Sequence, residues 1–101
     1  MALPDVIRVR QTFDRTRLAD PCRAVTDGLR ALPLTHTLRP GARVAITAGS
    51  RGISNLVGMT RAAADVVKAA GGRPFIVPAM GSHGGASGDG QRNLLADLGI
   101  S

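Results

Sequence analysis

The chain lacks the aromatic residues that support base stacking. It has no tryptophan and no tyrosine among 101 residues, and its two aromatic side chains are Phe13 and Phe75. We expect both in the core, which leaves no platform on which bases could stack. Nucleic-acid binding is therefore disfavoured, although the net charge is +6 and the isoelectric point is about 11.5. The arginines are spread along the chain, and they also suit small anionic ligands or an acidic partner surface.

Cysteine is almost absent, and long apolar runs are missing. Cys22 is the single cysteine, so an internal disulfide is impossible and a reducing cytoplasm is the expected location. We interpret Cys22 as a small buried residue on a helix. Residues 1–4 are followed at once by Asp5 and two nearby arginines. We therefore expect neither a signal peptide nor a membrane-spanning segment.

Strand-like and helix-like segments alternate along the chain. Periodicity and turn residues predict strands over 6–13, 43–47 and 74–78, and helices over 21–32, 55–70 and 91–98. Connections of helix length favour a parallel sheet with right-handed crossovers. The expected fold class is therefore α/β, with a short parallel sheet flanked by helices in a Rossmann-like partial domain. We expect residues 1–101 to form a single domain of this kind.

Local patterns refine the predicted strands and helices. Segment 6–13 shows an apolar and polar alternation through residues 6–10, which is typical of a half-exposed edge strand. Segment 43–47 carries consecutive apolar residues, as in a strand that is covered on both faces. Segment 34–41 is expected to be a loop. The expected helix N-caps are Asp20, Ser54 and either Ser87 or Asp89.

A glycine-rich loop follows each of the last two predicted strands. In parallel sheets, ligands bind beyond the carboxyl ends of the strands, and the N–H groups of loops and helix starts favour anions there. Both loops lie at that end of the sheet. The candidate binding residues are Gly49, Ser50, Arg51 and Gly52 in the first loop and Gly81, Ser82 and Gly84 in the second.

His83 and Arg51 are the candidate catalytic residues. A histidine exchanges protons at neutral pH, and the glycines beside His83 leave its imidazole free and let the backbone approach a ligand. Arg51 stands between two glycines, and its planar guanidinium suits bidentate binding of a carboxylate or phosphate. Neighbouring strands would bring both residues to one crevice that fits a small hydroxy acid or similar anion. The alternative for each is an incidental exposed side chain, which is how we interpret His36.

Several familiar site motifs are missing from the sequence. Loop 81–86 lacks the Lys-Ser/Thr pair of a P-loop, and neither loop carries a dinucleotide-binding GxGxxG with its acid. The spacing supports no Ser-His-Asp triad. Two histidines and one cysteine do not make a metal site, so no residue is assigned to a metal.

Two segments nevertheless resemble a known family. GSRGI, followed closely by Asn55, and GGRPFIVPAMGSHGGA, followed by Gly90 and Gln91, strongly resemble the amino-terminal region of proteins related to nickel-dependent lactate racemase. The resemblance covers residues 43–101 and is most specific over 75–85. Residues 1–39 match only in general layout.

The resemblance implies a fold and an activity. Family members are longer two-domain α/β proteins that bind a nickel-pincer nucleotide between the domains. A histidine takes the hydroxyl proton of a 2-hydroxy acid while the α-hydride moves to the cofactor ring, and the hydride then returns to either face. By motif position, His83 matches one of two acid/base histidines, and Arg51 matches the arginine that holds the substrate carboxylate. The expected function is that of a racemase or epimerase, an isomerase acting on a small 2-hydroxy acid.

The chain also departs from the family pattern. The second catalytic histidine, the nickel-binding histidine and the lysine that tethers the cofactor lie in regions outside this sequence, so we expect the 101 residues alone to be inactive. Ala48 stands where the racemases have an aspartate, and Gly84-Gly85 stands where lactate racemases often carry larger residues. A second domain or subunit would complete the site. The alternative is a non-catalytic α/β module or subunit that binds a small anion or a nucleotide.

Overall fold

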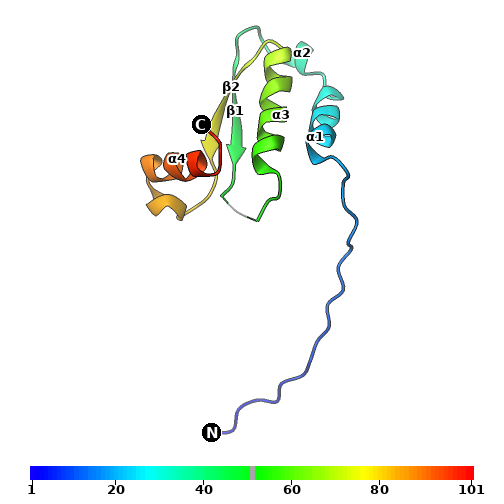
Figure 1. Ribbon diagram of the computed structural model, residues 1–101, viewed down its shortest axis with the longest axis vertical. Helices are drawn as coiled ribbons and strands as arrows, with labels where there is room; N and C mark the ends of the chain where they lie inside the picture. Colours follow the sequence, from blue (N-terminus) through cyan, green and yellow to red (C-terminus); the bar gives the residue numbers. More distant parts are fainter. Residues whose placement is uncertain (51) are drawn as a thin grey trace.

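The computed structural model describes residues 1–50 and 52–101 (Figure 1). Four α-helices, two β-strands and one 3₁₀ turn follow one another along these residues. They are α1 (Pro21–Arg30), α2 (Leu34–Thr37), β1 (Arg43–Ala48), α3 (Leu56–Ala69), β2 (Arg73–Pro78), η1 (His83–Ala86) and α4 (Gly88–Asp97). Within the described ranges, no helix has the length and apolar character needed to cross a membrane.

The two strands form a parallel sheet, which confirms the predicted α/β class. β1 and β2 pair in register from Arg43 opposite Arg73 to Ala48 opposite Pro78. Helix α3 connects them and packs against both strands. Because the strands are parallel, their carboxyl ends meet at one edge of the sheet, and both glycine-rich loops begin there (Figure 1).

The helix starts follow the predicted capping chemistry in two of three cases. The Asp20 side chain accepts a hydrogen bond from the Arg23 N–H at 2.9 Å, and Pro21 opens α1. Ser87 caps α4 by accepting from the Gly90 N–H at 3.1 Å. The predicted Ser54 cap is wrong, because the cap position of α3 is Asn55, which has φ of 59° and makes no side-chain capping bond.

A single helical turn, α2, replaces part of the loop predicted over 34–41. It forms because the Pro33 carbonyl accepts hydrogen bonds from the N–H groups of His36 and Thr37, at 3.1 and 3.0 Å. The Thr37 hydroxyl donates to the same carbonyl at 2.8 Å. A proline has no N–H of its own to donate, but its carbonyl and fixed φ suit the start of a turn.

Helices α1 and α3 pack side by side through small residues. A Cβ added at Gly58 would lie 2.7 Å from the Cys22 sulfur, so only glycine permits this separation of the two helices. Cys22 lies on a helix, as predicted, and is half-buried rather than fully buried. Thr26 also bonds back to the Cys22 carbonyl at 3.1 Å. The helix pair therefore depends on a close approach at this one point.

The core is small and almost entirely aliphatic. Ala48, Met80 and Leu95 form its centre beside the carboxyl ends of the strands, where α4 meets the sheet. Val66 and Val67 are buried on α3. None of these side chains is aromatic, in keeping with the composition of the chain.

One face of the sheet is open, which corrects the prediction that residues 43–47 are covered on both faces. Burial alternates along β1, so that Arg43, Ala45 and Thr47 are exposed while the residues between them are partly covered. Helix α3 alone cannot cover both faces of two strands. Phe75 is 37% exposed rather than in the core, and the Arg43 guanidinium lies 4.6 Å from the centroid of its ring.

Residues 1–18, which we call the N-terminal arm, form neither helix nor strand. They extend away from the rest of the molecule (Figure 1), and Phe13 is 69% exposed. The predicted strand over 6–13 and the predicted core position of Phe13 are therefore wrong. The alternating pattern is present, but a strand also needs a neighbouring strand for its N–H and C=O groups.

Candidate functional site

The two glycine-rich loops meet through one side-chain hydrogen bond. Ser50 follows β1 and His83 follows β2, and the Ser50 Oγ lies within hydrogen-bonding distance of the His83 Nδ1. The residues are 33 positions apart in the chain. They come together because Ala48 and Pro78 are paired at the ends of two parallel strands. The predicted convergence of the loops is therefore seen at Ser50 and His83.

The hydrogen bond fixes the orientation of the imidazole. His83 begins η1 and is half-buried, as is Ser50. The bond occupies Nδ1, and no described residue forms a hydrogen bond with Nε2. Which of the two nitrogens carries the proton decides whether the Ser50 hydroxyl donates or accepts. In either tautomer, Nε2 is the ring nitrogen that can face a ligand.

The histidine turn is held against the start of α4. Gly84, with φ of 65°, lies so close to Gly90 that a Cβ on Gly84 would come within 2.6 Å of the Gly90 carbonyl carbon. The Gln91 side-chain amide donates to the Gly81 carbonyl at 2.9 Å, and the Ser87 hydroxyl donates to the Gly84 carbonyl at 3.3 Å. Gly84 thus serves the packing of this loop. Its lack of a side chain therefore has a packing role in addition to the predicted one of admitting a ligand.

The other predicted binding residues surround this contact. Gly49 is half-buried, whereas Gly52, Gly81 and Ser82 are exposed. Arg51 lies outside the described residues, so its predicted proximity to His83 stays a prediction. His36 is exposed on α2, away from both loops.

A hollow of about 450 Å³ adjoins the first loop. It extends from the loop to the start of α3 and the end of α4, and its lining residues are Ser50, Gly52, Ile53, Asn55, Leu56, Val57, Gly58 and Leu98. Its lining residues are mostly aliphatic, with Ser50 and Asn55 as the polar ones. A small organic acid would find both an apolar wall and polar groups in this hollow.

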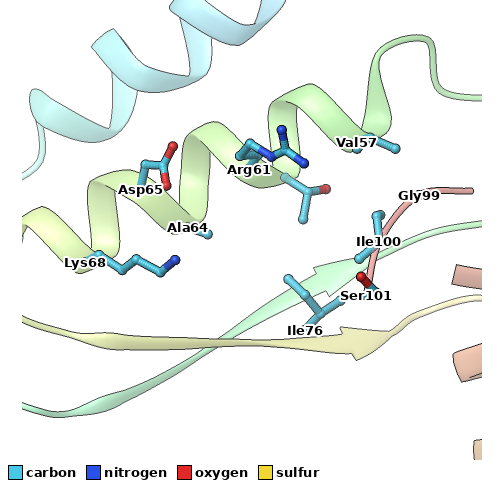
Figure 2. A pocket seen from close by; sticks show the side chains of 10 residues that line it. Val57, Arg61, Ala64, Asp65, Lys68, Ile76, Gly99, Ile100 and Ser101 are labelled. Carbon is cyan, nitrogen blue, oxygen red and sulfur yellow. The ribbon is translucent and has the colours of Figure 1, made fainter. Parts of the chain in front are cut away.

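A second hollow, of about 210 Å³, lies along α3 and is separate from the loops (Figure 2). Arg61, Asp65 and Lys68 line its side on α3, and Ile76 and Ile100 line its side near the strands. Neither Ser50 nor His83 takes part in it. Within residues 1–50 and 52–101, no three histidine, cysteine, aspartate or glutamate side chains gather closely enough to hold a metal ion.

Sequence reasoning placed Ser50 in the site but missed its role as the partner of His83. The signal was available in principle. Ser50 is the second residue after β1 and His83 is the fifth after β2, and paired strand ends bring such positions together. What could not be foreseen is the direction of the imidazole, which depends on how η1 folds against α4.

Comparisons of the chain with protein-family models, with curated protein sequences and with solved structures found no match. The resemblance to the lactate racemase family therefore rests on the residues of the two loops. The family, the activity and the cofactor that it implies stay predictions.

Proposed function

We propose that this chain is the amino-terminal part of a lactate racemase-like 2-hydroxy-acid racemase or epimerase. The observation that carries the proposal is the hydrogen bond between Ser50 and His83 at the carboxyl edge of the parallel sheet. It joins the two loops whose sequences resemble that family. An incidental surface histidine would need no partner from a loop 33 residues away.

In this proposal, His83 acts as the general base and acid. Ser50 holds the imidazole through Nδ1, so that Nε2 is directed toward the substrate and takes the proton of its hydroxyl group. The same nitrogen returns the proton to the oxygen of that hydroxyl group when the product forms. Orientation matters because a proton-transfer group must lie within hydrogen-bonding distance of the atom that it serves.

Arg51 is proposed to hold the substrate carboxylate. Its guanidinium would form two parallel hydrogen bonds to the carboxylate, which fixes the α-carbon relative to His83. The hollow beside the first loop would take the remainder of the substrate, with the aliphatic side chains of Ile53 and Leu56 in its wall.

The nickel-pincer nucleotide of the family supplies a hydride acceptor when it is bound. The described residues do not fit the metal part of this cofactor, because they contain no cluster of metal ligands. The chain's own share of the chemistry is to bind the hydroxy acid and to move one proton at Nε2.

Binding of lactate to the 101-residue chain tests the proposal directly. Titration with lactate, followed by NMR, is expected to shift the His83 imidazole signals and the backbone signals of residues 49–52 and 81–84. The His36 imidazole is the internal control and should not move. Propionate, which lacks the hydroxyl group, should leave the His83 signals nearly unchanged. Equal responses to lactate and propionate would contradict a role of His83 toward the hydroxyl.

Substitution of Ser50 separates positioning from binding. Ser50→Ala removes the hydrogen bond to Nδ1, a net loss of about 1 kcal/mol for that interaction. We expect the His83 ring to become mobile and its response to lactate to weaken, while the unfolding free energy falls by no more than about 1 kcal/mol. If the ring keeps its orientation in Ser50→Ala, Ser50 does not position it.

The second candidate function is a non-catalytic site for small anions. It is favoured by the two glycine-rich loops at the carboxyl edge, where backbone N–H groups are available to an anion. This function predicts that phosphate or a mononucleotide binds as well as lactate does. It also predicts that His83→Asn leaves that binding intact. Under the racemase proposal, His83→Asn weakens binding of lactate and leaves propionate unaffected.

A further inference from the structure

The two free edges of the sheet differ in their capacity to accept another strand. The Arg73 N–H donates to the Ala42 carbonyl and the Ala79 N–H donates to the Ala48 carbonyl, both at 2.7 Å. Along a strand, the N–H and C=O groups of successive residues point alternately to the two edges, within the plane of the sheet. The backbone groups of the odd-numbered residues of β2 and of the even-numbered residues of β1 therefore point toward the shared ladder. The remaining backbone groups of each strand face outward.

The outer edge of β2 is blocked by proline. Its outward positions are Pro74, Ile76 and Pro78, and two of these three have no N–H to donate. Proline on an edge strand is a recognised barrier to further strand pairing.

The outer edge of β1 is intact. Its outward positions are Arg43, Ala45 and Thr47, each with an N–H and a C=O. No described residue forms strand pairing there, since the sheet described has the order β1-β2. An open edge with all of its donors is a template for one more strand.

The N-terminal arm has the composition of that strand. Successive side chains of residues 6–13 would point to opposite faces. One face would carry Ile7, Val9, Gln11 and Phe13, and the other would carry Val6, Arg8, Arg10 and Thr12. The arm also carries most of the large exposed apolar side chains of the described residues. They are Met1, Leu3, Val6, Ile7, Val9, Phe13 and Leu18, with exposures from 68% to 120%.

We propose that the arm of one copy pairs with the free edge of β1 in a second copy, and that two copies exchange their arms. In the structure the arm extends away from its own sheet and leaves the β1 edge open (Figure 1). A second copy offers the same edge, and reciprocal exchange occupies both edges in a closed two-fold dimer. This proposal is independent of the proposed function.

The polarity of the arm agrees with the faces of the sheet. If Ile7, Val9 and Phe13 point toward α3, they extend the covered face of the sheet, where Val44 and Ile46 are partly buried. Arg8 and Arg10 then join the open face, which already carries the exposed Arg43. The occupant of the β1 edge would thus be apolar where the sheet is covered and charged where it is open.

Sedimentation velocity over a range of concentrations tests the proposal. The full chain is expected to be a dimer that dissociates on dilution. The double substitution Ile7→Asp with Val9→Asp should weaken dimerisation at least about tenfold, because it places two carboxylates on the apolar side of the arm. The matched control is Arg8→Asp with Arg10→Asp, which changes the charge of the opposite side and should leave a dimer. Equal weakening by both pairs would overturn the assignment of faces.

An isotope-filtered NOE experiment identifies the edge. In a mixture of labelled and unlabelled chains, contacts between chains are expected from residues 6–13 to residues 43–47. A monomer at every concentration would overturn the proposal, and so would a monomer whose arm pairs with its own β1. A dimer that persists after deletion of residues 1–18, with an unchanged unfolding midpoint, would also overturn it.

Discussion

The N-terminal arm and β1 have comparable patterns but different structures. Residues 7–10 of the arm alternate apolar and polar side chains, and burial alternates along β1. β1 is a strand because β2 and α3 lie against it, whereas the arm has no such neighbours in the structure and extends away (Figure 1). The comparison teaches that alternation identifies which side of a segment can be buried. It does not supply the partner that buries it.

The comparison predicts that substitutions at close contacts in the body, residues 20–101, cost stability, whereas those in the arm outside the proposed pairing segment 6–13 do not. Three substitutions test this gradient. The first disturbs a backbone contact of the turn that carries His83, and the second disturbs the contact between α1 and α3. The third removes a hydrogen bond within the arm.

The largest effect is expected from Gly90→Ala. The new Cβ would clash with the backbone of Gly84 and would lie 2.8 Å from its carbonyl carbon. Backbone cannot move aside as a flexible side chain can, so we expect a loss of about 3 kcal/mol in unfolding free energy. The hydrogen bond between Ser50 and His83 should be lost as well. Urea unfolding and the His83 NMR signals measure the two effects.

Gly88→Ala is the control for this substitution. Gly88 lies in the same helix, and an added Cβ would meet nothing within 4 Å. The unfolding free energy of Gly88→Ala should change much less than that of Gly90→Ala. Similar losses for both variants would show that helix α4, rather than the contact with Gly84, determines the stability of the loop.

An intermediate effect is expected from Gly58→Ala. Its Cβ would lie 2.7 Å from the Cys22 sulfur, and overpacking of this kind costs about 1–3 kcal/mol. The combination with Cys22→Ala should restore part of the loss, because the smaller side chain removes the close contact.

Gly28→Ala in α1 is the contrasting case, since its Cβ meets nothing within 4 Å. That variant should gain about 0.5–1 kcal/mol from helix propensity.

The smallest effect is expected in the arm. Asp14 accepts hydrogen bonds from the Thr16 hydroxyl at 2.6 Å and from the Thr16 N–H at 2.8 Å, and these bonds lower the pKa of the Asp14 carboxyl below its ordinary 3.8. Thr16→Val removes the hydroxyl bond, so the Asp14 pKa should rise toward that ordinary value. A carboxyl titration followed by NMR measures the change.

The sign of any effect on stability follows from the direction of the Asp14 shift. Because the pKa is lowered in the ordered turn, the ionised Asp14 stabilises the turn at pH values above the ordinary pKa. This stabilisation is lost as the pH falls through the lowered pKa. Asp14 is fully exposed in the arm, so Thr16→Val should leave the unfolding of the body unchanged. A change in the midpoint of the body would show that the turn at Asp14 contributes to the stability of the body, which would break the comparison.

The elements that the sequence predicted well are those with local causes. Asp20 and Pro21 start α1 through their own chemistry, and both observed strands lie within one residue of the predicted bounds. The covered faces could not be predicted in the same way. The sequence predicts Phe75 in the core, yet it lies on the open face opposite Ala45.

The candidate site was predictable in its location but not in its contacts. The glycine-rich loops after β1 and β2 indicated the carboxyl edge, and Ser50 and His83 were both placed there. The hydrogen bond between them joins positions 33 residues apart, and it also depends on how the turn at Gly84 packs on Gly90. No local pattern in the sequence reports such a fit.

The turn beneath His83 has a consequence for chirality. Gly84, Gly85 and Ala86 follow one another with φ of 65°, 69° and 55°, which is backbone of left-handed helical sense. For an L-amino acid with a Cβ this conformation costs roughly 1–2 kcal/mol, and Ala86 bears that cost. A D-alanine at position 86, introduced by chemical synthesis, has the mirror-image preference and would relieve it. At this α-carbon, which is three residues from the proposed acid/base, the enantiomer that ribosomes do not use is the better fit to the fold.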